Sequence, residues 1–421
     1  MVLLVMKFGG TSVADIDHIR NVARHIKREV DAGNRCAVVV SAMAGHTNRL
    51  VGWAREVSSL HDAREYDTVV SSGEQVTSGL LAIALQSMHI PARSWQGWQI
   101  PLSTDGVHGA ARISGIAVAN IKRRIEEGEV AVISGFQGIS PENRITTLGR
   151  GGSDTSAVAI AAALDADRCD IYTDVDGVYT TDPRIVPKAR RLNRISYEEM
   201  LEMASLGAKV LQTRSVELAM VRRVRLMVRS SFEPPETSLP AANHCQNDPP
   251  SGTLVCDEDE ILEKQIVSGI AYTKDEAKVT LLNVADKPGV AASVFGPLAA
   301  ADINVDMIVQ NVSEDGRYTD MTFTVQDTEL EKTLKVVAGA KDKIGYADLR
   351  GSTDVVKISV IGVGMRSHAG VAAKMFKALA EKGINIQAIT TSEIKISILI
   401  EAAYTELAVR TLHTLYELDA E

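Results

Sequence analysis

The clearest chemical feature of the chain is a lysine placed directly before paired glycines. Residues 7–12 read Lys-Phe-Gly-Gly-Thr-Ser and follow the short apolar run of residues 1–6. Glycines at a strand-to-helix turn let backbone N–H groups approach an anion, the helix N-terminus adds positive potential, and the lysine adds a full charge. In a P-loop the lysine instead follows the glycines. The segment predicts a phosphate-binding turn, although Gly-Gly also occurs in turns without a ligand.

A second glycine cluster surrounds an arginine. Residues 149–154 read Gly-Arg-Gly-Gly-Ser-Asp and precede residues 155–164, whose pattern predicts a helix. Glycines at a helix N-terminus form a concave nest of N–H groups that suits anions. The alternative is an ordinary glycine loop in which Ser153 or Asp154 caps the helix, but that alternative leaves Arg150 between glycines unexplained.

An acidic turn, residues 173–184, follows a predicted strand and reads Thr-Asp-Val-Asp-Gly-Val-Tyr-Thr-Thr-Asp-Pro-Arg. It lacks the closing glutamate of a calcium-binding EF-hand loop. The four cysteines, Cys36, Cys169, Cys245 and Cys256, form no CxxC pair and lie at no metal-ligand spacing from a histidine. We therefore expect no resident metal and no disulfide framework, which favours a reducing compartment.

Alternating strands and helices must position these turns. The expected strands cover residues 2–8, 36–41, 130–134, 170–173 and 225–228, and the expected helices cover residues 15–30, 75–88, 155–164 and a segment opened by a capping box at residues 196–199. Alternation of this kind predicts a mostly parallel sheet covered by helices.

The C-terminal part of the sequence repeats itself. It follows residues 233–252, which hold five of the chain's twelve prolines and predict a linker or an exposed loop. Residues 278–284 then resemble residues 357–363, and each copy reads as most of a βαββαβ unit. The second copy lacks room for its last strand, so we expect residues 264–272, which precede the first copy, to complete it.

Composition and charge exclude several classes of protein. The chain has 421 residues and a net charge of -9, and it is 45% hydrophobic but only 4% aromatic, which suits aliphatic α/β cores. The nearest basic cluster is Arg222, Arg223, Arg225 and Arg229, which is better explained as a solvated helix end and strand edge than as a nucleic-acid site. No run approaches the ~18 apolar residues of a membrane span. We expect a cytoplasmic protein that binds neither nucleic acid nor membrane.

Seven stretches of the first region together resemble the amino-acid kinase family, and most closely its aspartokinase branch. In family order they are KFGGTSV (7–13), VVVSAM (38–43), SSGEQ (71–75), SGFQG (134–138), GRGGSD (149–154), YTDVDGVYTTDPR (172–184) and GAKVL (207–211). The repeated region is similar to paired ACT domains, so the resemblance spans nearly the whole chain. It implies a three-layer αβα kinase fold with a mostly parallel sheet, followed by two ferredoxin-like βαββαβ ACT domains.

The resemblance also implies domain boundaries. These are a catalytic domain over residues 1–232, a proline-rich linker over 233–260, an inserted first ACT domain over 275–350, and a second ACT domain made of 261–274 and 351–421. The proline-rich stretch is longer than we expect for the family.

The roles of the family's site residues carry over position by position. Nucleotide contacts are implied for Lys7, Phe8, Gly9, Gly10, Ser12, Thr173, Asp174, Tyr179, Arg184 and Lys209. Substrate contacts are implied for Ser41, Thr47, Glu74, Phe136, Arg150, Ser153 and Asp154, and the catalytic residues among these are Lys7, Arg150 and Asp154. Glu74 suits an ammonium group and Arg150 suits a carboxylate. Phe136 also fits core packing, and Ser41 also fits a strand-end cap.

The implied activity is transfer of the γ-phosphate of ATP, carried with Mg²⁺, to the side-chain carboxylate of L-aspartate. The product would be 4-phospho-L-aspartate, in the first step of lysine, threonine and methionine biosynthesis. A carboxylate with a reference pKa of about 3.9 needs no general base, so catalysis would rest on positioning and charge neutralisation. One alternative is a kinase for glutamate, acetylglutamate or a nucleotide, and the other is a non-catalytic amino-acid sensor on an inactive kinase scaffold.

The ACT pair implies feedback regulation by lysine, threonine or both. The implied ligand residues are Asp286, Asn304, Asp306, Gln310, Val371, Ala372, Asn385, Ile386 and Ser392. Turn and strand-edge chemistry would explain these residues on their own, but the duplication and the attached kinase favour a ligand site. No methionine lies between Met227 and Met307 to start a separate regulatory subunit. We therefore expect a single-chain homodimer, or a larger homo-oligomer, assembled through the ACT domains.

Overall fold

The computed structural model describes residues 2–207, 210–234, 252–261, 265–312, 317–368 and 370–419. The chain forms two compact units. The N-terminal unit contains Met1–Val178, Arg191–Ala204 and Lys209–Glu263, and the C-terminal unit contains Tyr179–Arg190, Ser205–Ala208 and Lys264–Glu421.

An eight-stranded sheet forms the centre of the N-terminal unit. Its strands, in spatial order, are β10 (Arg194–Ser196), β12 (Thr253–Cys256), β11 (Leu226–Ser230), β9 (Arg168–Thr173), β1 (Leu3–Phe8), β2 (Arg35–Val40), β6 (Val130–Ser134) and β3 (Ala92–Trp95). All neighbouring pairs are parallel except β11 and β12, which are antiparallel. The central strands are buried on both faces, which explains why they read as continuous aliphatic runs.

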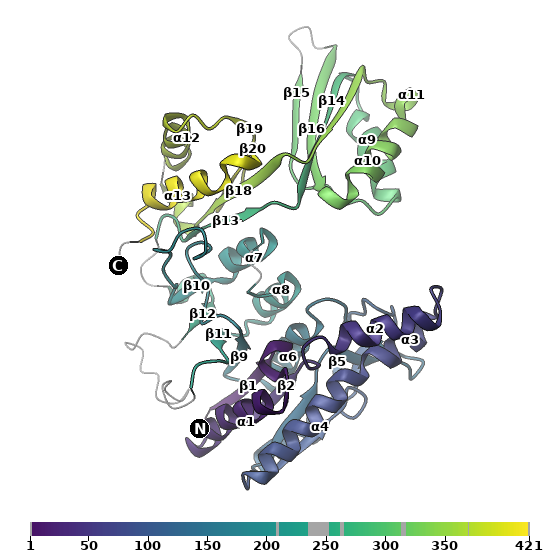
Figure 1. The fold of residues 1–421 in the computed structure, drawn as a ribbon, viewed down its shortest axis with the longest axis vertical. Coiled ribbons are helices and arrows are strands. Elements are labelled where there is room, and N and C mark those ends of the chain that lie inside the picture. The colour runs from purple at the N-terminus through teal and green to yellow at the C-terminus, as the bar shows by residue number, and fades with distance from the viewer. Residues whose placement is uncertain are drawn as a thin grey trace. The chain divides into compact units, whose positions relative to one another are not determined.

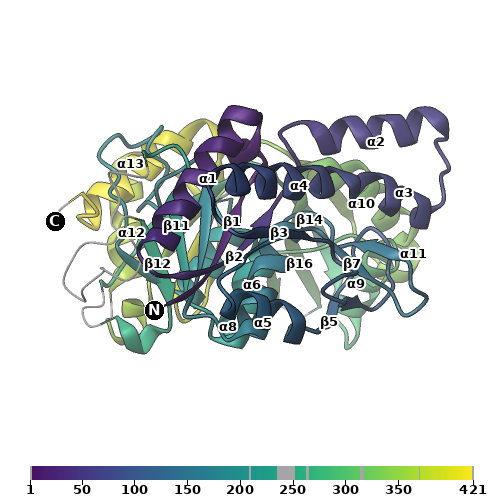
Figure 2. The same cartoon turned by 90° about the horizontal axis from the view of Figure 1, so that it is seen from below.

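Helices cover both faces of this sheet and complete the three-layer fold that was predicted (Figures 1 and 2). On one face lie α1 (Ile16–Asp31) and α4 (Ser72–Ser87), and on the other lie α5 (Ala119–Glu126), α6 (Gly152–Leu164) and α8 (Thr213–Arg222). The helix α7 (Tyr197–Ser205) begins with the predicted capping box, which is confirmed by hydrogen bonds in both directions between Ser196 and Glu199.

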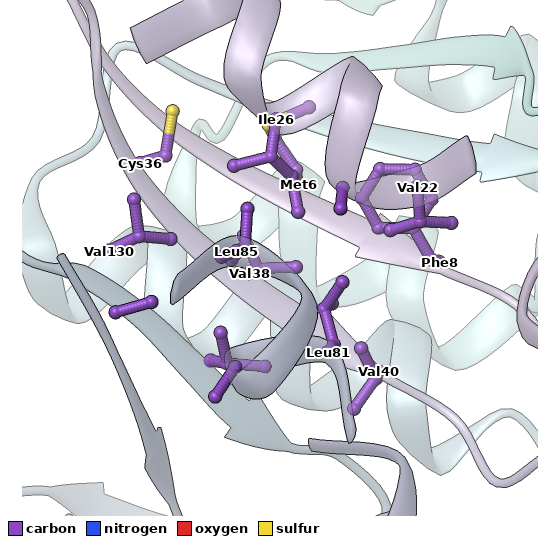
Figure 3. Packing of buried hydrophobic residues seen from close by; sticks show 14 of the residues in the cluster. Met6, Phe8, Val22, Ile26, Cys36, Val38, Val40, Leu81, Leu85 and Val130 are labelled. Carbon is purple, nitrogen blue, oxygen red and sulfur yellow. The ribbon is translucent and has the colours of Figure 1, made fainter. Parts of the chain in front are cut away.

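Helix α1 shows how the sequence specifies this packing. The side chain of Asp15 caps the helix by accepting a hydrogen bond from the backbone N–H of His18. Ile19, Val22 and Ile26 then recur at helical spacing and are buried against the sheet. Figure 3 shows Val22 and Ile26 beside Met6 and Phe8 of β1, with Leu81 and Leu85 of α4 in the same cluster.

Two helices and a small sheet extend the N-terminal unit beyond what the sequence pattern indicated. The helices are α2 (His46–Val57) and α3 (Ala63–Val70). The small sheet has the order β5 (Ile113–Ile116), β4 (Leu102–Thr104), β7 (Gln137–Ile139) and β8 (Ile145–Thr147). Its strands are too short to show a reliable alternation of apolar and polar residues.

The structure differs from the expected linker over residues 233–260. Residues 253–256 form β12, which adds to the large sheet between β10 and β11. Thr253, Val255 and Cys256 are buried there, and the Thr253 hydroxyl donates to the carbonyl of Leu192 over 2.6 Å. The linker prediction is wrong for this part because a mostly apolar tetrapeptide that pairs with a strand on each side gains both hydrogen bonds and burial. Residues 235–251 lie outside the described part of the chain.

The C-terminal unit contains two repeats of one architecture, each with helices on one face of a four-stranded antiparallel sheet (Figure 1). The first has the order β15 (Ile308–Val312), β16 (Tyr318–Gln326), β14 (Glu276–Ala285) and β17 (Asp348–Ser352), with α9 (Val290–Ala300), α10 (Leu330–Gly339) and α11 (Lys341–Ile344). The second has the order β13 (Gly269–Thr273), β18 (Val355–Ile361), β20 (Lys395–Glu401) and β19 (Ile386–Thr391), with α12 (Val371–Glu381) and α13 (Thr405–Leu415). Since β13 precedes the first repeat in the chain but pairs with β18, the first repeat is inserted within the second.

Residues 179–190 also belong to the C-terminal unit, although the sequence analysis placed them in a catalytic domain of residues 1–232. Ile185 and Val186 are buried in the core of the second repeat. The carbonyl of Ile185 accepts from Nε of Arg410 over 2.9 Å, and the carbonyl of Thr180 accepts from the N–H of Ile270 over 2.7 Å. Burial of this apolar pair explains the difference, because sequence order alone does not reveal which core a short loop joins.

No helix within the described ranges has the length and apolarity that crossing a membrane requires. Cys36, Cys169 and Cys256 are buried free thiols, whereas Cys245 lies outside the described residues.

Candidate active site

A pocket of about 340 Å³ lies at the carboxyl ends of β1, β2 and β6, where ligands bind in open parallel sheets. It brings together nine of the residues expected from the sequence. These are Lys7, Gly10, Ser41, Thr47, Glu74, Phe136, Arg150, Ser153 and Asp154. They come from stretches that lie far apart in the chain, so the pocket exists only after the sheet has formed.

The phosphate-binding candidate Lys7 lies almost at the end of β1. Its Nζ is 2.5 Å from Oδ1 of Asp154, and both side chains are nearly buried. A Cβ added at Gly9 would lie 3.4 Å from that Nζ, and one at Gly10 would lie 3.0 Å from the carbonyl oxygen of Ala42. The contact at Gly9 would be an ordinary one, whereas a side chain at Gly10 would press on the backbone of the neighbouring loop, so Gly10 is the position where the close approach requires glycine.

The turn that carries Arg150 is built from glycines with left-handed backbone. Gly149 and Gly151 have φ values of 77° and 71°, which glycine adopts without strain. Gly151 occupies the N-cap position of α6, and no side-chain hydrogen bond caps this helix. The alternative in which Ser153 or Asp154 caps the helix is therefore wrong. Ser153 and Asp154 instead lie in the first turn of α6 and line the pocket. Arg150 is exposed and makes no ion pair with any residue that the structure describes.

Glu74 is a buried carboxylate with one oxygen unused. Its Oε1 accepts from the N–H of Ala42 over 3.0 Å, while the buried Oε2 has no hydrogen-bond partner among the described residues. Only 3% of Glu74 is exposed, and burial raises the pKa of its carboxyl to about 7. An unpaired buried carboxylate of this kind is suited to a cationic ligand group.

A pH dependence follows from Glu74. Below about pH 7 the carboxyl of the free enzyme is protonated and neutral, so it cannot form an ion pair with a substrate ammonium group. We expect kcat/KM for the amino-acid substrate to rise with pH through about 7, because this parameter reports the free enzyme. Initial rates at saturating ATP would measure this rise of kcat/KM with pH, which should disappear in Glu74→Gln. A wild-type kcat/KM that does not change through neutral pH would contradict the expected role of Glu74 in binding the ammonium group.

Phe136 also lines the pocket. It lies between β6 and β7 with a φ of 68°, an uncommon value for a residue with a side chain. Its N–H donates to Oγ of Ser156 over 3.1 Å, and a Cβ added at Gly152 would lie 2.8 Å from its ring. Phe136 therefore both lines the pocket and packs on the glycine turn, so the two roles considered for it are compatible.

The expected nucleotide residues of β1 and β9 lie at the same edge of the sheet. The Ser12 hydroxyl donates to Oγ of Ser231 over 2.8 Å, and Ser231 Oγ donates to the carbonyl of Thr173 over 3.1 Å. Thr173 Oγ donates to Asp174 over 3.0 Å. Phe8 differs, because its ring is fully buried and stacks on Tyr172 with the ring centroids 4.5 Å apart, and its carbonyl accepts from the N–H of Ser41 over 3.1 Å. The structure therefore does not place Phe8 among the residues that line the pocket.

Comparison with known proteins bears directly on this site. Residues 2–230 match the amino acid kinase family, and residues 278–341 and 358–416 each match an ACT domain. An aspartate kinase of Stutzerimonas stutzeri is 52% identical over 420 residues, which cover 100% of this chain and 98% of that protein. The chain belongs to the aspartate kinases of the amino acid kinase family. An aspartokinase of Helicobacter pylori is 47% identical over 424 residues and covers 99% of this chain and 100% of its own length.

Solved aspartate kinases share the whole architecture. Aspartokinase III of Escherichia coli, in complex with aspartate and ADP in its R-state, superposes with a TM-score of 0.77 at 27% identity and covers 98% of this chain and 99% of its own. The same enzyme in complex with lysine and aspartate, in its T-state, gives a TM-score of 0.75 at 27% identity, with coverage of 98% and 99%. The predicted fold class, a mixed α/β kinase domain followed by ACT domains, is confirmed.

All the nucleotide contacts implied by the aspartate kinase resemblance stay predictions, and three of these residues are not among the described residues of the N-terminal unit. Tyr179 and Arg184 belong to the C-terminal unit, where Arg184 is exposed and pairs with Asp182 at 2.8 Å. Lys209 lies outside the described residues.

Sequence reasoning missed one part of the aspartate kinase pocket. The loop after β2 contributes Ala42, Met43, Ala44 and Gly45, and α2 contributes Asn48 beside Thr47. The available signal was the position of this loop after a buried strand whose carboxyl end meets the lysine turn.

Proposed function

We propose that the enzyme transfers the γ-phosphate of ATP, supplied as its magnesium complex, to the side-chain carboxylate of L-aspartate. The product is 4-phospho-L-aspartate, and the reaction is the first step of lysine, threonine and methionine biosynthesis. The observation that carries the proposal is one pocket that holds a lysine followed by paired glycines, a buried carboxylate with one oxygen that no described residue binds, and an arginine that forms no ion pair within the described part of the chain. These groups match a phosphoryl group, an ammonium and a carboxylate.

In this proposal the residues of the chain act by positioning and by charge. Glu74 holds the substrate ammonium, and Arg150 holds a carboxylate with its planar guanidinium. Lys7 neutralises charge that develops on the transferring phosphoryl group, and the first turn of α6 adds the positive end of its dipole. Magnesium bound to the nucleotide supplies further charge neutralisation. The attacking carboxylate is already ionised at neutral pH, so the step needs no base.

The test is an assay with ATP and a panel of acceptors. Aspartate, glutamate and acetylglutamate would each be incubated with MgATP, and the acyl phosphate would be trapped with hydroxylamine. The proposal expects ADP and trapped hydroxamate in equal amounts with aspartate, and little of either with the other acceptors. A preference for glutamate or acetylglutamate would overturn it.

Regulation by lysine, threonine or both is a further part of the proposal. Asn304 and Asn385 are exposed. Asn385 directly precedes β19 and Asn304 lies four residues before β15, and both strands are edge strands of their sheets. Val371 opens α12 after Gly370, and Asp286 precedes the turn at Gly289 that opens α9. Exposed helix N-termini favour a ligand carboxylate. The other implied ligand residues lie nearby in sequence: β15 contains Gln310, α12 contains Ala372, and β19 begins at Ile386 and is followed by Ser392. The free edges suit association with a second copy of the chain.

Asp306 has an additional contact in this region. Its carboxylate pairs with Nζ of Lys357, which also lies 2.7 Å from Glu276, so this ion cluster joins the two repeats. Lys357 and Glu276 are buried, whereas the Asp306 side chain is 54% exposed and open to a ligand ammonium. A ligand that binds Asp306 would therefore compete with Lys357, and would favour one arrangement of the repeats over another.

We expect lysine and threonine together to inhibit more strongly than either amino acid alone. Allosteric coupling between two binding sites is typically ~1–3 kcal/mol, or about 5- to 150-fold in affinity, and it must be reciprocal. Asn385→Ala should relieve inhibition while leaving uninhibited kcat within about twofold. Asp306→Ala should also relieve it, with some loss of stability because Lys357 loses a partner.

Inhibition curves and calorimetry would measure these effects. The control is Asn311→Ala, since Asn311 is exposed on β15 and its side chain alternates with that of Gln310. If neither amino acid inhibits the wild type or produces binding heat, the ACT pair serves assembly alone.

A further inference from the structure

A buried aspartate outside the pocket connects the two segments that carry Glu74 and Arg150. Asp67 lies in α3 and is completely buried. Its Oδ2 accepts from Nδ1 of His108 at 2.8 Å, from the N–H of Gly109 at 3.1 Å and from the N–H of Thr147 at 3.0 Å. Its Oδ1 accepts from the Thr147 hydroxyl at 2.6 Å. One carboxylate therefore joins α3 to the loop at residues 108–109 and to the end of β8 through four hydrogen bonds.

These two segments lie at the base of the turn that carries Arg150. Thr147 ends β8, and Gly149 follows two residues later. A Cβ added at Gly149 would lie 3.1 Å from the carbonyl oxygen of Gly109, so the two loops are in close contact. Arg214 adds a second brace, because its guanidinium donates to the carbonyls of Leu148 and Ala111, both over 2.7 Å.

The other end of the connection leads to Glu74. Helix α3 ends at Val70, and α4 begins at Ser72 with Glu74 in its first turn. Between the helices, the carbonyl of Ser71 accepts from Nε2 of Gln137 over 3.0 Å. A displacement of α3 would therefore be passed to Glu74 through a short and tightly held connection.

We propose that Asp67 is a positioning residue that sets the distance between Glu74 and Arg150. The inference rests on the proposed function, in which these two residues hold the ammonium and the carboxylate of the same small substrate. No direct contact joins Glu74 to Arg150 among the described residues, so their separation depends on what lies behind them. A substrate held at both ends is sensitive to that separation, since a displacement of ~1 Å can cost on the order of 100-fold in rate.

Asp67→Asn tests the proposal with the least change in shape. An asparagine carries one acceptor oxygen in place of two, so it cannot accept all four hydrogen bonds. We expect KM for aspartate to rise about tenfold or more and KM for ATP to stay within about twofold, because the lysine turn is not attached to Asp67. Steady-state kinetics with each substrate varied in turn would give both constants.

Asp170→Asn is the matched control. Asp170 is also completely buried and also holds several partners, since it binds Arg168 at 2.5 Å and Arg229 at 3.3 Å. It lies on β9 and does not line the pocket. The control should lower the melting temperature without raising KM for aspartate. If Asp67→Asn behaves in the same way, its role is structural only and the proposal is overturned.

A double-mutant cycle with Thr147→Val provides a second and milder test. This substitution removes one of the four hydrogen bonds and keeps the side-chain volume, whereas Thr147→Ser keeps the hydroxyl and should restore a near-normal KM for aspartate. If Asp67 and Thr147 act through one connection, the double variant should be less impaired than the product of the two single effects. Fully independent effects would contradict the proposal.

A failure of the positioning role can be distinguished from a failure of the proposed function. A wild-type enzyme that does not phosphorylate aspartate would refute that function. An active wild type, with an aspartate KM that neither Asp67→Asn nor Thr147→Val changes, would refute only the positioning role.

Discussion

Replacing Lys7 by alanine is expected to lower kcat by about 100- to 1,000-fold, the usual effect of losing one preorganised donor to developing charge. The ammonium lies almost at the end of β1 and is followed by Gly9 and Gly10. In the proposed mechanism its contact with the phosphoryl group would be strongest in the transition state, so both KM values should change much less than kcat. Steady-state kinetics on the purified variant would give kcat and both KM values.

Two further variants make this result interpretable. Lys7→Ala leaves Asp154 without its ion-pair partner at 2.5 Å, so thermal unfolding must show that the variant is folded at the assay temperature. Lys27→Ala is the matched control, because Lys27 forms an exposed pair with Asp31 on α1 and should leave kcat unchanged. A folded Lys7→Ala enzyme with near-normal kcat would remove Lys7 from the mechanism.

Replacing Glu74 by glutamine is expected to raise KM for aspartate by about 10- to 100-fold, which corresponds to losing a charge-assisted hydrogen bond of ~1.5–3 kcal/mol. Glutamine keeps the side-chain volume and an oxygen for the N–H of Ala42, so the loop after β2 should stay in place. ATP affinity should be nearly unaffected, because the lysine turn is intact. Kinetics at saturating ATP would give the aspartate KM, and kinetics at saturating aspartate would give the ATP KM.

Glu199→Gln provides the control for Glu74→Gln. Glu199 is also a buried glutamate of the N-terminal unit, and it completes the capping box of α7, a role that glutamine can also fill. That variant should leave both KM values unchanged. A collapse of ATP affinity in Glu74→Gln would instead show that Glu74 is structural or faces the nucleotide. Glu74→Ala should raise the aspartate KM at least as much, because it also removes the acceptor for Ala42.

Several features could be derived from local sequence because their physical cause is local. The capping box at Ser196 and Glu199 and the buried stripe of α1 depend on residues only a few positions apart. The glycines around Arg150 indicate a turn with left-handed backbone, which residues with side chains adopt only with strain. The duplication in the C-terminal region indicated two similar repeats, and each repeat has its own four-stranded sheet.

The tertiary structure decided the features that depend on which segments become neighbours. The sheet order places β1 between β9 and β2, and this order brings Lys7 to Asp154 and Ser12 to Ser231. The addition of β12 to the sheet, and the burial of Ile185 in the second repeat, depend on edges and cores that local sequence does not describe.

The charged residues of the site show the same difference between what local sequence determines and what the folded structure determines. The sequence determined that a glutamate, a lysine and an arginine are present, and where each lies relative to glycines, strands and helices. It did not determine that Glu74 is 3% exposed, and this burial raises the pKa of its carboxyl to about 7. Nor did it reveal Asp67, which no motif marks and whose four hydrogen bonds come from residues distant in the chain. Desolvation and non-local hydrogen bonds are properties of the packed chain, so only the folded structure sets them.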